Sequence, residues 1–266
     1  MPKKVLTIAG SDTLSGGGLQ ADLATFSEYG LVGFTAITSI VTVVEEEFLI
    51  HAVDLSLLEE QLQTIAELPK MSGIKLGLLP TVEMIELVGR FLMENPEIPV
   101  VVDPVLVFKE TSEVQVEHVR EAMKKFIFPY AKVMTPNLVE AQILANVPKM
   151  TTVEEMKRAA EILFSFGTQN IVIKGGARIK GNLAIDIVYN GKEFTEFRSE
   201  KLQTTTNNGA GCTFASAIIS NLVLGAEVNE AVEKAKEFVY AGIRSGVPLS
   251  KTLGNVWQGA KRQASE

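Results

Sequence analysis

Short apolar runs alternate with amphipathic segments along almost the whole chain. The runs are rich in Val and Ile, which indicates buried strands, and the segments between them repeat apolar residues at helical spacing. The predicted strands are residues 5–9, 34–44, 74–79, 98–102, 132–134 and 171–173. The predicted helices are residues 19–29, 57–67, 82–93, 138–145, 153–166 and 227–245. This alternation is typical of an α/β fold, in which helices cover both faces of a mostly parallel sheet.

One pair of strands departs from the parallel pattern. Residues 184–188 and 193–197 are joined by Tyr189-Asn190-Gly191-Lys192, and an Asn-Gly pair between two strands indicates a β-hairpin. We expect this hairpin to form an antiparallel edge of the sheet. No Ser/Gly-rich or Pro-rich linker interrupts the sequence, so we expect one domain over residues 1–266.

Charge and cysteine content narrow the function classes. The chain has 25 Lys and Arg against 32 Asp and Glu, a net charge of -7, and no basic stripe, so we expect no nucleic-acid partner. The apolar part of residues 1–10 is too short for a signal sequence or a membrane span, so we expect no membrane partner. Cys212, the single cysteine, cannot form an intramolecular disulfide, which favours a reducing, cytoplasmic location.

The most informative stretch is residues 204–222, where a polar turn with several glycines leads into an apolar helix. Gly209 and Gly211 permit backbone geometries in which successive N–H groups converge on an anion at the start of that helix. Cys212 follows on the first helical turn, where the helix dipole and nearby N–H groups favour its thiolate, a base or nucleophile. The alternative is a glycine-rich connection before a buried helix, with an incidental cysteine.

Polar residues also follow the predicted strands, at the edge of a parallel sheet where ligands bind. Gly10-Ser11-Asp12 follows the first strand, and Gly77-Leu78 ends a later one. The next loop, residues 15–18, fits neither a P-loop nor a dinucleotide-binding turn, so by itself it predicts only a flexible turn. Asp22, on the helix after this loop, is by itself a first-turn carboxylate that the helix dipole favours.

Two carboxylates and a lysine at strand ends have the chemistry of a phosphoryl-transfer site. Asp103 is fixed between a strand and Pro104, and Glu140 lies one helical turn after Asn137. Such a pair suits Mg²⁺, a hard cation that prefers oxygen ligands. Glu140 can also be the third residue of a helix that Asn137 caps, and both roles can hold together. Lys174 ends a strand, where an unpaired ammonium is costly unless it meets an anion such as a phosphate.

Together these motifs resemble those of the ribokinase-like vitamin kinases, which include the hydroxymethylpyrimidine (phosphate) kinases of thiamine synthesis and the pyridoxal kinases. The matching segments, in the family's order, are Ile8-Ala9-Gly10-Ser11-Asp12, Gly18-Leu19-Gln20-Ala21-Asp22-Leu23, Asp103-Pro104-Val105, Thr135-Pro136-Asn137-Leu138-Val139-Glu140, Lys174-Gly175-Gly176 and Asn207-Asn208-Gly209-Ala210-Gly211-Cys212-Thr213. The resemblance implies a ribokinase-like three-layer α/β/α fold, with ATP and Mg²⁺ as cofactors. The wider superfamily has Asp as the catalytic base where this branch has Cys212.

The resemblance also implies a role for each motif. Cys212 would accept or polarise a hydroxyl proton, and the N–H groups of Gly209, Ala210 and Gly211 would stabilise the phosphoryl group in transfer. The residues implied in ATP binding are Asn137, Lys174, Asn208 and Gly209, and those implied in metal binding are Asp103 and Glu140. The residues implied in substrate binding are Gly10, Asp12, Asp22, Val43, Leu78, Val105 and Phe108. The segment 104–118 would close as a lid that excludes water, and we expect a homodimer.

Three positions bear on the choice of substrate. Hydroxymethylpyrimidine kinases have Gln at the end of the strand that closes here with Thr42-Val43, and Val43 cannot hydrogen-bond a polar ring edge. Loss of such a pairing costs about 1 to 3 kcal/mol, which favours the pyridoxal branch. That branch has a second cysteine in the lid where this chain has Phe108, and usually His at the place of Asn208.

Three functions follow from the resemblance. The first is ATP-dependent phosphorylation of the hydroxymethyl group of pyridoxal, pyridoxine or pyridoxamine, the reaction of vitamin B6 salvage. The second is the same chemistry on hydroxymethylpyrimidine or its phosphate. The third is a vitamin-binding protein without turnover, which the complete set of phosphoryl-transfer residues disfavours, because a binder does not need one.

Overall fold

The computed structural model describes residues 1–45, 47–106 and 113–263. Its strands are β1 (Lys4–Asp12), β2 (Val32–Val44), β3 (Glu47–Ala52), β4 (Gly73–Leu76), β5 (Val100–Val102), β6 (Val133–Met134), β7 (Ile171–Lys174), β8 (Leu183–Tyr189), β9 (Phe194–Glu200), β10 (Val247–Pro248) and β11 (Gly254–Asn255). Its helices are α1 (Gly18–Glu28), α2 (Leu55–Ala66), α3 (Val82–Met93), α4 (Glu113–Phe126), η1 (Phe128–Tyr130), α5 (Leu138–Ala145), α6 (Val153–Phe164), α7 (Ala210–Leu224), α8 (Val228–Arg244) and α9 (Ala260–Gln263). No helix within these ranges combines the length and the apolar character that crossing a bilayer requires.

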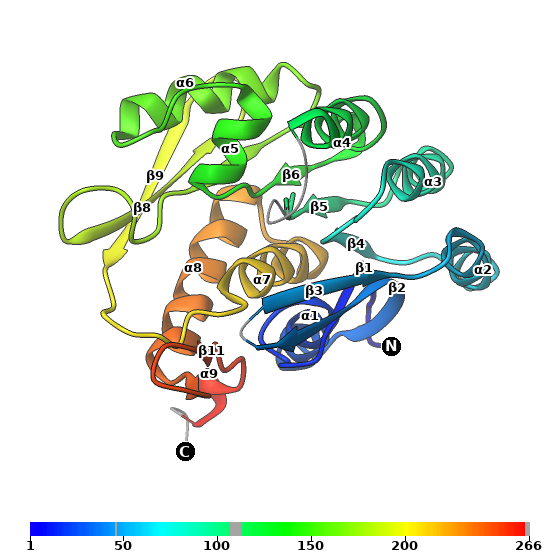
Figure 1. Ribbon diagram of the computed structural model, residues 1–266, viewed down its shortest axis with the longest axis horizontal. Helices are drawn as coiled ribbons and strands as arrows, with labels where there is room; N and C mark the ends of the chain where they lie inside the picture. The colour runs from blue at the N-terminus through cyan, green and yellow to red at the C-terminus, as the bar shows by residue number, and fades with distance from the viewer. Residues whose placement is uncertain (46, 107–112, 264–266) are drawn as a thin grey trace.

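One large sheet runs through the molecule in the strand order β3-β2-β1-β4-β5-β6-β7-β8-β9 (Figure 1). The strands from β2 to β7 pair in parallel, whereas β3 at one edge and the β8–β9 hairpin at the other are antiparallel. The predicted parallel sheet and its hairpin edge are confirmed. The strand β3 is not among the predicted strands, because its apolar run, Phe48-Leu49-Ile50, is too short to predict a strand by itself.

Helices cover both faces of the sheet, because successive strand side chains point to opposite sides. Val101 of β5 packs in a core with α1, α7 and α8. Val100 and Val102, its neighbours on the same strand, pack in a second core with the helices from α2 to α6. The two cores make the predicted three-layer α/β/α arrangement, which is confirmed (Figure 1).

The main differences from the predicted elements lie where strands lead into the site. The predicted strand 74–79 ends at Leu76, and the chain leaves the sheet at Gly77. Helix α4 is not among the predicted helices, and the predicted lid, residues 104–118, overlaps its first residues. Residues 107–112, and with them Phe108, lie outside the described residues.

Candidate active site

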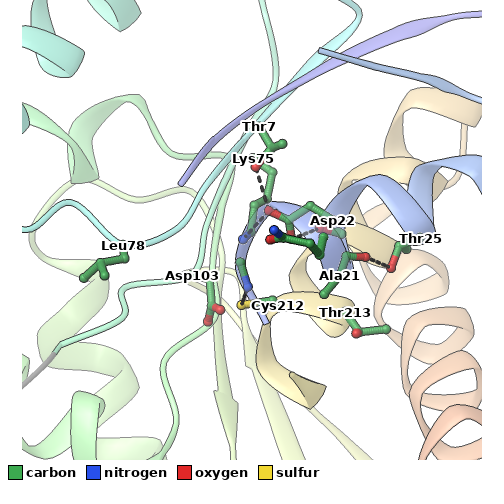
Figure 2. A network of polar contacts seen from close by, with 12 residues as sticks. Thr7, Ala21, Asp22, Thr25, Lys75, Leu78, Asp103, Cys212 and Thr213 are labelled. Carbon is green, nitrogen blue, oxygen red and sulfur yellow. Dashed lines mark hydrogen bonds and ion pairs between the residues drawn. The ribbon is translucent and has the colours of Figure 1, made fainter. Parts of the chain in front are cut away.

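The functional motifs meet at one edge of the sheet. Because β2 to β7 are parallel, their carboxyl ends share this edge, which carries Asp12, Asp103 and Lys174. Helix α7 begins beside them: a Cβ added to Gly211 would lie 3.3 Å from Nζ of Lys174 and 3.5 Å from Oδ2 of Asp103. Figure 2 shows Asp103 and Cys212 together in one view. The absence of a side chain at Gly211 therefore lets the helix start approach the charged residues closely.

Two glycine-rich turns pack against each other at the centre of the site. Gly209, the N-cap of α7, has a φ of 84°, and a Cβ there would lie 1.5 Å from the carbonyl oxygen of Gly16. A Cβ on Gly16 would lie 1.9 Å from Nδ2 of Asn208. Side chains at these two positions would push the turns apart, so the predicted need for glycine at Gly209 is confirmed. The loop 15–18 is therefore held by the second turn and is not merely a flexible connection.

Cys212 lies on the first turn of α7, but its surroundings disfavour the predicted thiolate. The N–H group of Gly18, at the start of α1, donates to Sγ at 3.4 Å. Burial raises the pKa of the Cys212 thiol to about 11, although the positive charge of Lys75 lowers it in part. The prediction of a favoured thiolate is therefore wrong, because the cost of burying its charge outweighs the N–H group and the helix start. At neutral pH the thiol is protonated.

Asp103 and Lys174 form a buried ion pair next to this turn. Nζ of Lys174 donates to Oδ1 of Asp103 at 2.8 Å, and the two side chains are 15% and 3% exposed. Burial opposes both charges, but the attraction between the partners outweighs it, so the pKa of Asp103 is lowered and that of Lys174 is raised. The predicted anion partner of Lys174 is, in this structure, the carboxylate of Asp103. Its contact with a phosphate stays a prediction.

Glu140 takes part in a capping box at the start of α5. Its Oε2 accepts from the N–H of Asn137 at 2.7 Å, and Oδ1 of Asn137 accepts from the N–H groups of Val139 and Glu140. The predicted capping role is confirmed. Burial raises the pKa of Glu140 to about 7, Lys174 acts in the opposite direction, and Asp103 raises it further. Since the side-chain oxygen of Asn137 is engaged in the cap, its role in ATP binding stays a prediction.

Asp103 and Glu140 could hold a magnesium ion, whose remaining ligands would be phosphate oxygens and water. Burial resists the ionisation of Glu140, whereas the nearby positive charges of Lys174 and Arg178 favour it. A bound dication would favour the ionised carboxylate further. Within the described ranges, no cluster of three His, Cys, Asp or Glu side chains could hold a metal. Mg²⁺ commonly binds one or two carboxylates together with substrate phosphates, so this smaller donor set suits it.

Asp12 orders the first glycine-rich turn. Its carboxylate accepts from the N–H groups of Leu14, Gly16 and Gly17 at 2.9, 3.1 and 2.8 Å, and the residue is only 7% exposed. The loop N–H groups engage its oxygens and give this side chain a loop-ordering role, and its predicted contact with substrate stays a prediction. Gly10, two residues earlier in β1, is buried, and its substrate role stays a prediction.

Asp22 is fully buried, with donors on both of its oxygens (Figure 2). Oδ2 accepts from Oγ1 of Thr7 at 2.6 Å and from Nζ of Lys75 at 2.8 Å. Oδ1 accepts from Oγ of Ser216 at 2.7 Å. The substrate contact predicted for Asp22 is wrong, because none of its side chain is exposed and internal groups satisfy it.

Lys75, the partner of Asp22, belongs to no predicted motif. A signal for it nevertheless exists in the sequence, because Lys75 stands between Ile74 and Leu76 in an apolar strand. The argument that predicts an anion partner for Lys174 applies equally to a lysine in this position. Both lysines pair with an internal carboxylate, but the side chain of Lys75 is fully buried, whereas that of Lys174 is 15% exposed at the strand end.

An apolar hollow of about 310 Å³ lies at the same edge of the sheet. Its lining comes from β3, from the segments after β4 and β5 and from α4, and consists of Ile50, Ala52, Leu78, Leu79, Pro80, Thr81, Val105, Leu106, Val116 and Val119. Leu78 and Val105, both predicted to bind substrate, therefore lie together. Val43 is not among the described residues that line the hollow, although it lies on the same face of the β2–β3 pair as Ile50. The volume suits one small ring.

Asn208 is held by the segment around β11. Its Nδ2 donates to Oδ1 of Asn255 at 2.9 Å, and Nδ2 of Asn255 donates to the carbonyl oxygen of Leu14 at 2.7 Å. Asn255 thus links the two glycine-rich turns, and no sequence motif points to it. The ATP role of Asn208 stays a prediction, since these contacts engage its amide within the fold.

Known proteins resemble this chain over nearly its full length. The phosphomethylpyrimidine kinase family matches residues 12–257. A pyridoxine kinase of Bacillus subtilis is 40% identical over 262 residues, which are 97% of each chain. The solved structure of the pyridoxal kinase from Staphylococcus aureus in complex with AMP-PCP and pyridoxal is 38% identical, with a TM-score of 0.93 over 99% of this chain and 96% of that chain. A hydroxymethylpyrimidine/phosphomethylpyrimidine kinase of Aquifex aeolicus is 33% identical over 247 residues, which are 92% of this chain and 96% of the relative.

These matches confirm the resemblance that the strand-end motifs indicate. The matched range, residues 12–257, includes both glycine-rich turns, the two carboxylates and the lysine of the charged cluster. The chain therefore belongs to the phosphomethylpyrimidine kinase family.

Proposed function

We propose that this protein transfers the γ-phosphoryl group of ATP to the hydroxymethyl group of pyridoxal, pyridoxine or pyridoxamine. The observation that carries the proposal is the position of a charged cluster, Asp103, Glu140 and Lys174, at the same sheet edge as an apolar hollow that fits one ring. The relatives that bear the names of pyridoxine and pyridoxal kinases match nearly the whole chain and support the same activity.

In the proposed reaction, the hydroxymethyl oxygen bonds to the γ-phosphorus while the bond from that phosphorus to the β–γ bridging oxygen breaks, and ADP leaves. Cys212 first loses its own proton to water, which is costly because the pKa of the thiol is about 11, and the thiolate then accepts the hydroxyl proton as the oxygen bonds to phosphorus. The N–H groups of Gly209, Ala210 and Gly211 are at the positive end of α7 and are proposed to stabilise charge on the phosphoryl oxygens, although that of Ala210 also donates to the carbonyl oxygen of Asn207 at 3.2 Å.

The nucleotide phosphates are assigned to the charged cluster. Lys174 contacts them, and Asp103 keeps its ammonium charged and in place. Asp103 and Glu140 would hold Mg²⁺, which supplies positive charge against the phosphate oxygens when bound. Asn137 and Asn208 complete the proposed nucleotide contacts.

The ring is assigned to the hollow, with Leu78 and Val105 in its wall, and Gly10, near the carboxyl end of β1, is proposed as a further substrate contact. An apolar wall pairs poorly with the polar edge of an aminopyrimidine, which places hydroxymethylpyrimidine second as a substrate. Val43, on the same sheet face as the wall, is the position where a polar partner for that edge is absent. The lid segment 104–118, with Phe108, is proposed to close over the ring and exclude water.

We also propose that the protein is a cytoplasmic homodimer. The outward face of the β2–β3 pair exposes Ile40, Val44 and Leu49 at 49%, 54% and 37%. Apolar side chains that gather on one sheet edge favour a protein partner, and a second copy is the simplest one. Light scattering after size-exclusion chromatography should give the mass of a dimer. The mass of a monomer at micromolar concentration would contradict this part of the proposal.

A turnover panel tests the function. The purified protein is incubated with Mg-ATP and pyridoxal, pyridoxine, pyridoxamine, hydroxymethylpyrimidine or its phosphate, and both ADP and the phosphorylated product are measured. We expect equal amounts of ADP and product with the pyridoxal-type substrates. Turnover with the pyrimidines alone would support the second function. Binding of a vitamer in calorimetry without ADP formation would support the vitamin-binding alternative.

A further inference from the structure

A closed polar cluster beside Cys212 has no part in the proposed mechanism. It consists of Thr7, Asp22, Lys75 and Ser216, all fully buried. Asp22 accepts a hydrogen bond from each of the other three side chains. An ion pair removed from water is costly to keep, and apolar side chains of similar volume often replace one without loss of stability. Stability of the fold alone therefore does not explain why Lys75 occupies this position.

Two contacts, one helical turn apart, connect this cluster to the thiol. At the start of α1 and α7, the N–H of Gly18 donates to Sγ of Cys212 at 3.4 Å. Four residues further along both helices, Asp22 accepts from Ser216 at 2.7 Å. Residues four apart lie on the same side of a helix, so the Asp22–Ser216 contact is the next one below the contact to the thiol. Figure 2 shows Asp22, Lys75 and Cys212 close together between the strands and these helices.

Lys75 brings a positive charge to this place from β4. Its Nζ would lie 3.0 Å from a Cβ on Gly77, so the ammonium is just below the strand end that leads to the hollow. Burial lowers the pKa of Lys75, but the negative charges of Asp22 and Asp103 act against this, so the pKa is raised and the lysine stays charged. This charge in turn favours negative charge at the sulfur.

We propose that Lys75 is a positioning residue for phosphoryl transfer, and that Asp22 holds its ammonium where it stabilises negative charge on Cys212. The inference rests on the proposed kinase function. The charged side chains that act on the sulfur are Lys75 from β4, Asp22 from α1, Asp103 after β5 and Lys174 from β7. Lys174 is assigned to phosphate, so of the two lysines among these charged side chains Lys75 is the one that acts on the thiol.

The test removes both charges of the pair together. A single Lys75→Met substitution would strand a buried carboxylate and risk unfolding, whereas Lys75→Met/Asp22→Asn leaves no unpaired charge. Lys75 acts more strongly on the thiol than Asp22 does, so the double variant should have a thiol that ionises less readily. Thr7→Val is the matched control, because it removes a hydrogen bond to the same carboxylate and leaves both charges. Circular dichroism and thermal unfolding establish that each variant is folded.

Two readouts decide the inference. The first is whether a variant changes kcat or KM. The second is the rate at which iodoacetamide alkylates Cys212, which is the single cysteine of the chain. The double variant should lose about fivefold in kcat and in alkylation rate, while KM stays within about twofold of wild type. A fivefold loss corresponds to a rise of somewhat less than one unit in the pKa of the thiol, because one unit changes the amount of thiolate tenfold. Thr7→Val should stay within about twofold of wild type in both. If the double variant does not fold, Lys75→Gln/Asp22→Asn, which removes both charges and keeps an N–H donor toward position 22, takes its place.

Several outcomes would overturn the inference. A folded double variant with wild-type kcat and alkylation rate would show that the lysine acts on stability alone. Equal losses in Thr7→Val would trace the effect to geometry and not to charge. A wild-type protein without turnover would instead refute the proposed kinase function, and the alkylation rates would still decide whether Lys75 acts on the thiol.

Discussion

The two ends of the site differ in the interactions that hold their side chains in place. At the transfer end, charged side chains hold one another, with Lys174–Asp103 and Lys75–Asp22 each at 2.8 Å and largely or wholly shielded from water. At the vitamin end, the lining of the hollow is mostly aliphatic. Changes at the charged end should therefore act on rate, whereas a changed contact at the apolar end should move substrate preference by about 1 to 3 kcal/mol. A protein built in this way can change the ring it accepts and keep the same phosphoryl-transfer chemistry.

The largest expected effect is at the thiol. Cys212→Ala should lower kcat by about 10²- to 10⁴-fold, the range for loss of a group that acts on a proton in the transition state. Vitamin binding should change little, because the apolar wall and the N–H groups of the turn stay in place. Steady-state kinetics and calorimetry measure the two quantities. A variant with wild-type kcat would remove the thiol from the mechanism.

The next effect concerns the stability of the folded protein and its pH dependence. The pKa of Glu140 is about 7 in the folded protein against an ordinary value of 4.5, so the folded state binds a proton more tightly than the unfolded state. The contribution of Glu140 to the free energy of unfolding is therefore greatest below about pH 4.5, and it falls as the pH rises to about 7. Glu140→Gln avoids this loss, so it should be about 2 to 3 kcal/mol more stable than wild type at pH 8 and nearly equal at pH 4.5.

Urea unfolding at the two pH values measures this difference in the free energy of unfolding. Gln still offers an oxygen to the N–H of Asn137, so the cap of α5 is preserved. An equal difference in stability at both pH values would show that burial of the Glu140 charge is not the cause. A gain in stability with a loss of turnover would mark a residue kept for function at the expense of the fold.

Asp103→Asn tests the Lys174–Asp103 ion pair at the charged end of the site. The substitution removes a negative charge from the proposed magnesium site and the anchor of Lys174. We expect the Mg²⁺ concentration for half-maximal activity to rise about 10- to 100-fold, because a hard, weakly held cation depends on carboxylate charge. Titration of activity with Mg²⁺ at saturating substrate measures it. An unchanged titration curve would place the metal elsewhere.

The sequence predicts the sheet and the positions of the strand-end motifs well, because both depend on local patterns. It fails where an outcome depends on distant partners. Whether Asp22 reaches a substrate is decided by Ser216, which lies 194 residues away, and by Lys75, 53 residues away. The predicted thiolate state of Cys212 is wrong for a similar reason, because burial by the whole fold outweighs the effect of the local helix start. The strand β3 escapes prediction because its apolar run, Phe48-Leu49-Ile50, is only three residues long and does not alternate with polar residues.

The smallest expected effect is at the apolar end. Val43→Gln should raise the ratio of kcat/KM for hydroxymethylpyrimidine over pyridoxine by about 5- to 100-fold, which corresponds to about 1 to 3 kcal/mol for a regained polar pairing. Thr42→Gln is the matched control, because Thr42 shares the outward face with Leu49 and turns away from the face that carries Ile50. Equal shifts in both variants, or none in Val43→Gln, would locate substrate choice elsewhere.

A competition assay on the wild-type protein tests the central claim most directly. Pyridoxine and hydroxymethylpyrimidine are present together at equal concentration with limiting Mg-ATP, and mass spectrometry gives the ratio of the two phosphorylated products, which equals the ratio of kcat/KM. A charged transfer end joined to an apolar ring pocket predicts that phosphorylated pyridoxine predominates by at least about tenfold, the equivalent of about 1.4 kcal/mol. Equal products, or an excess of the phosphorylated pyrimidine, would contradict the assignment of the hollow to a pyridoxal-type ring.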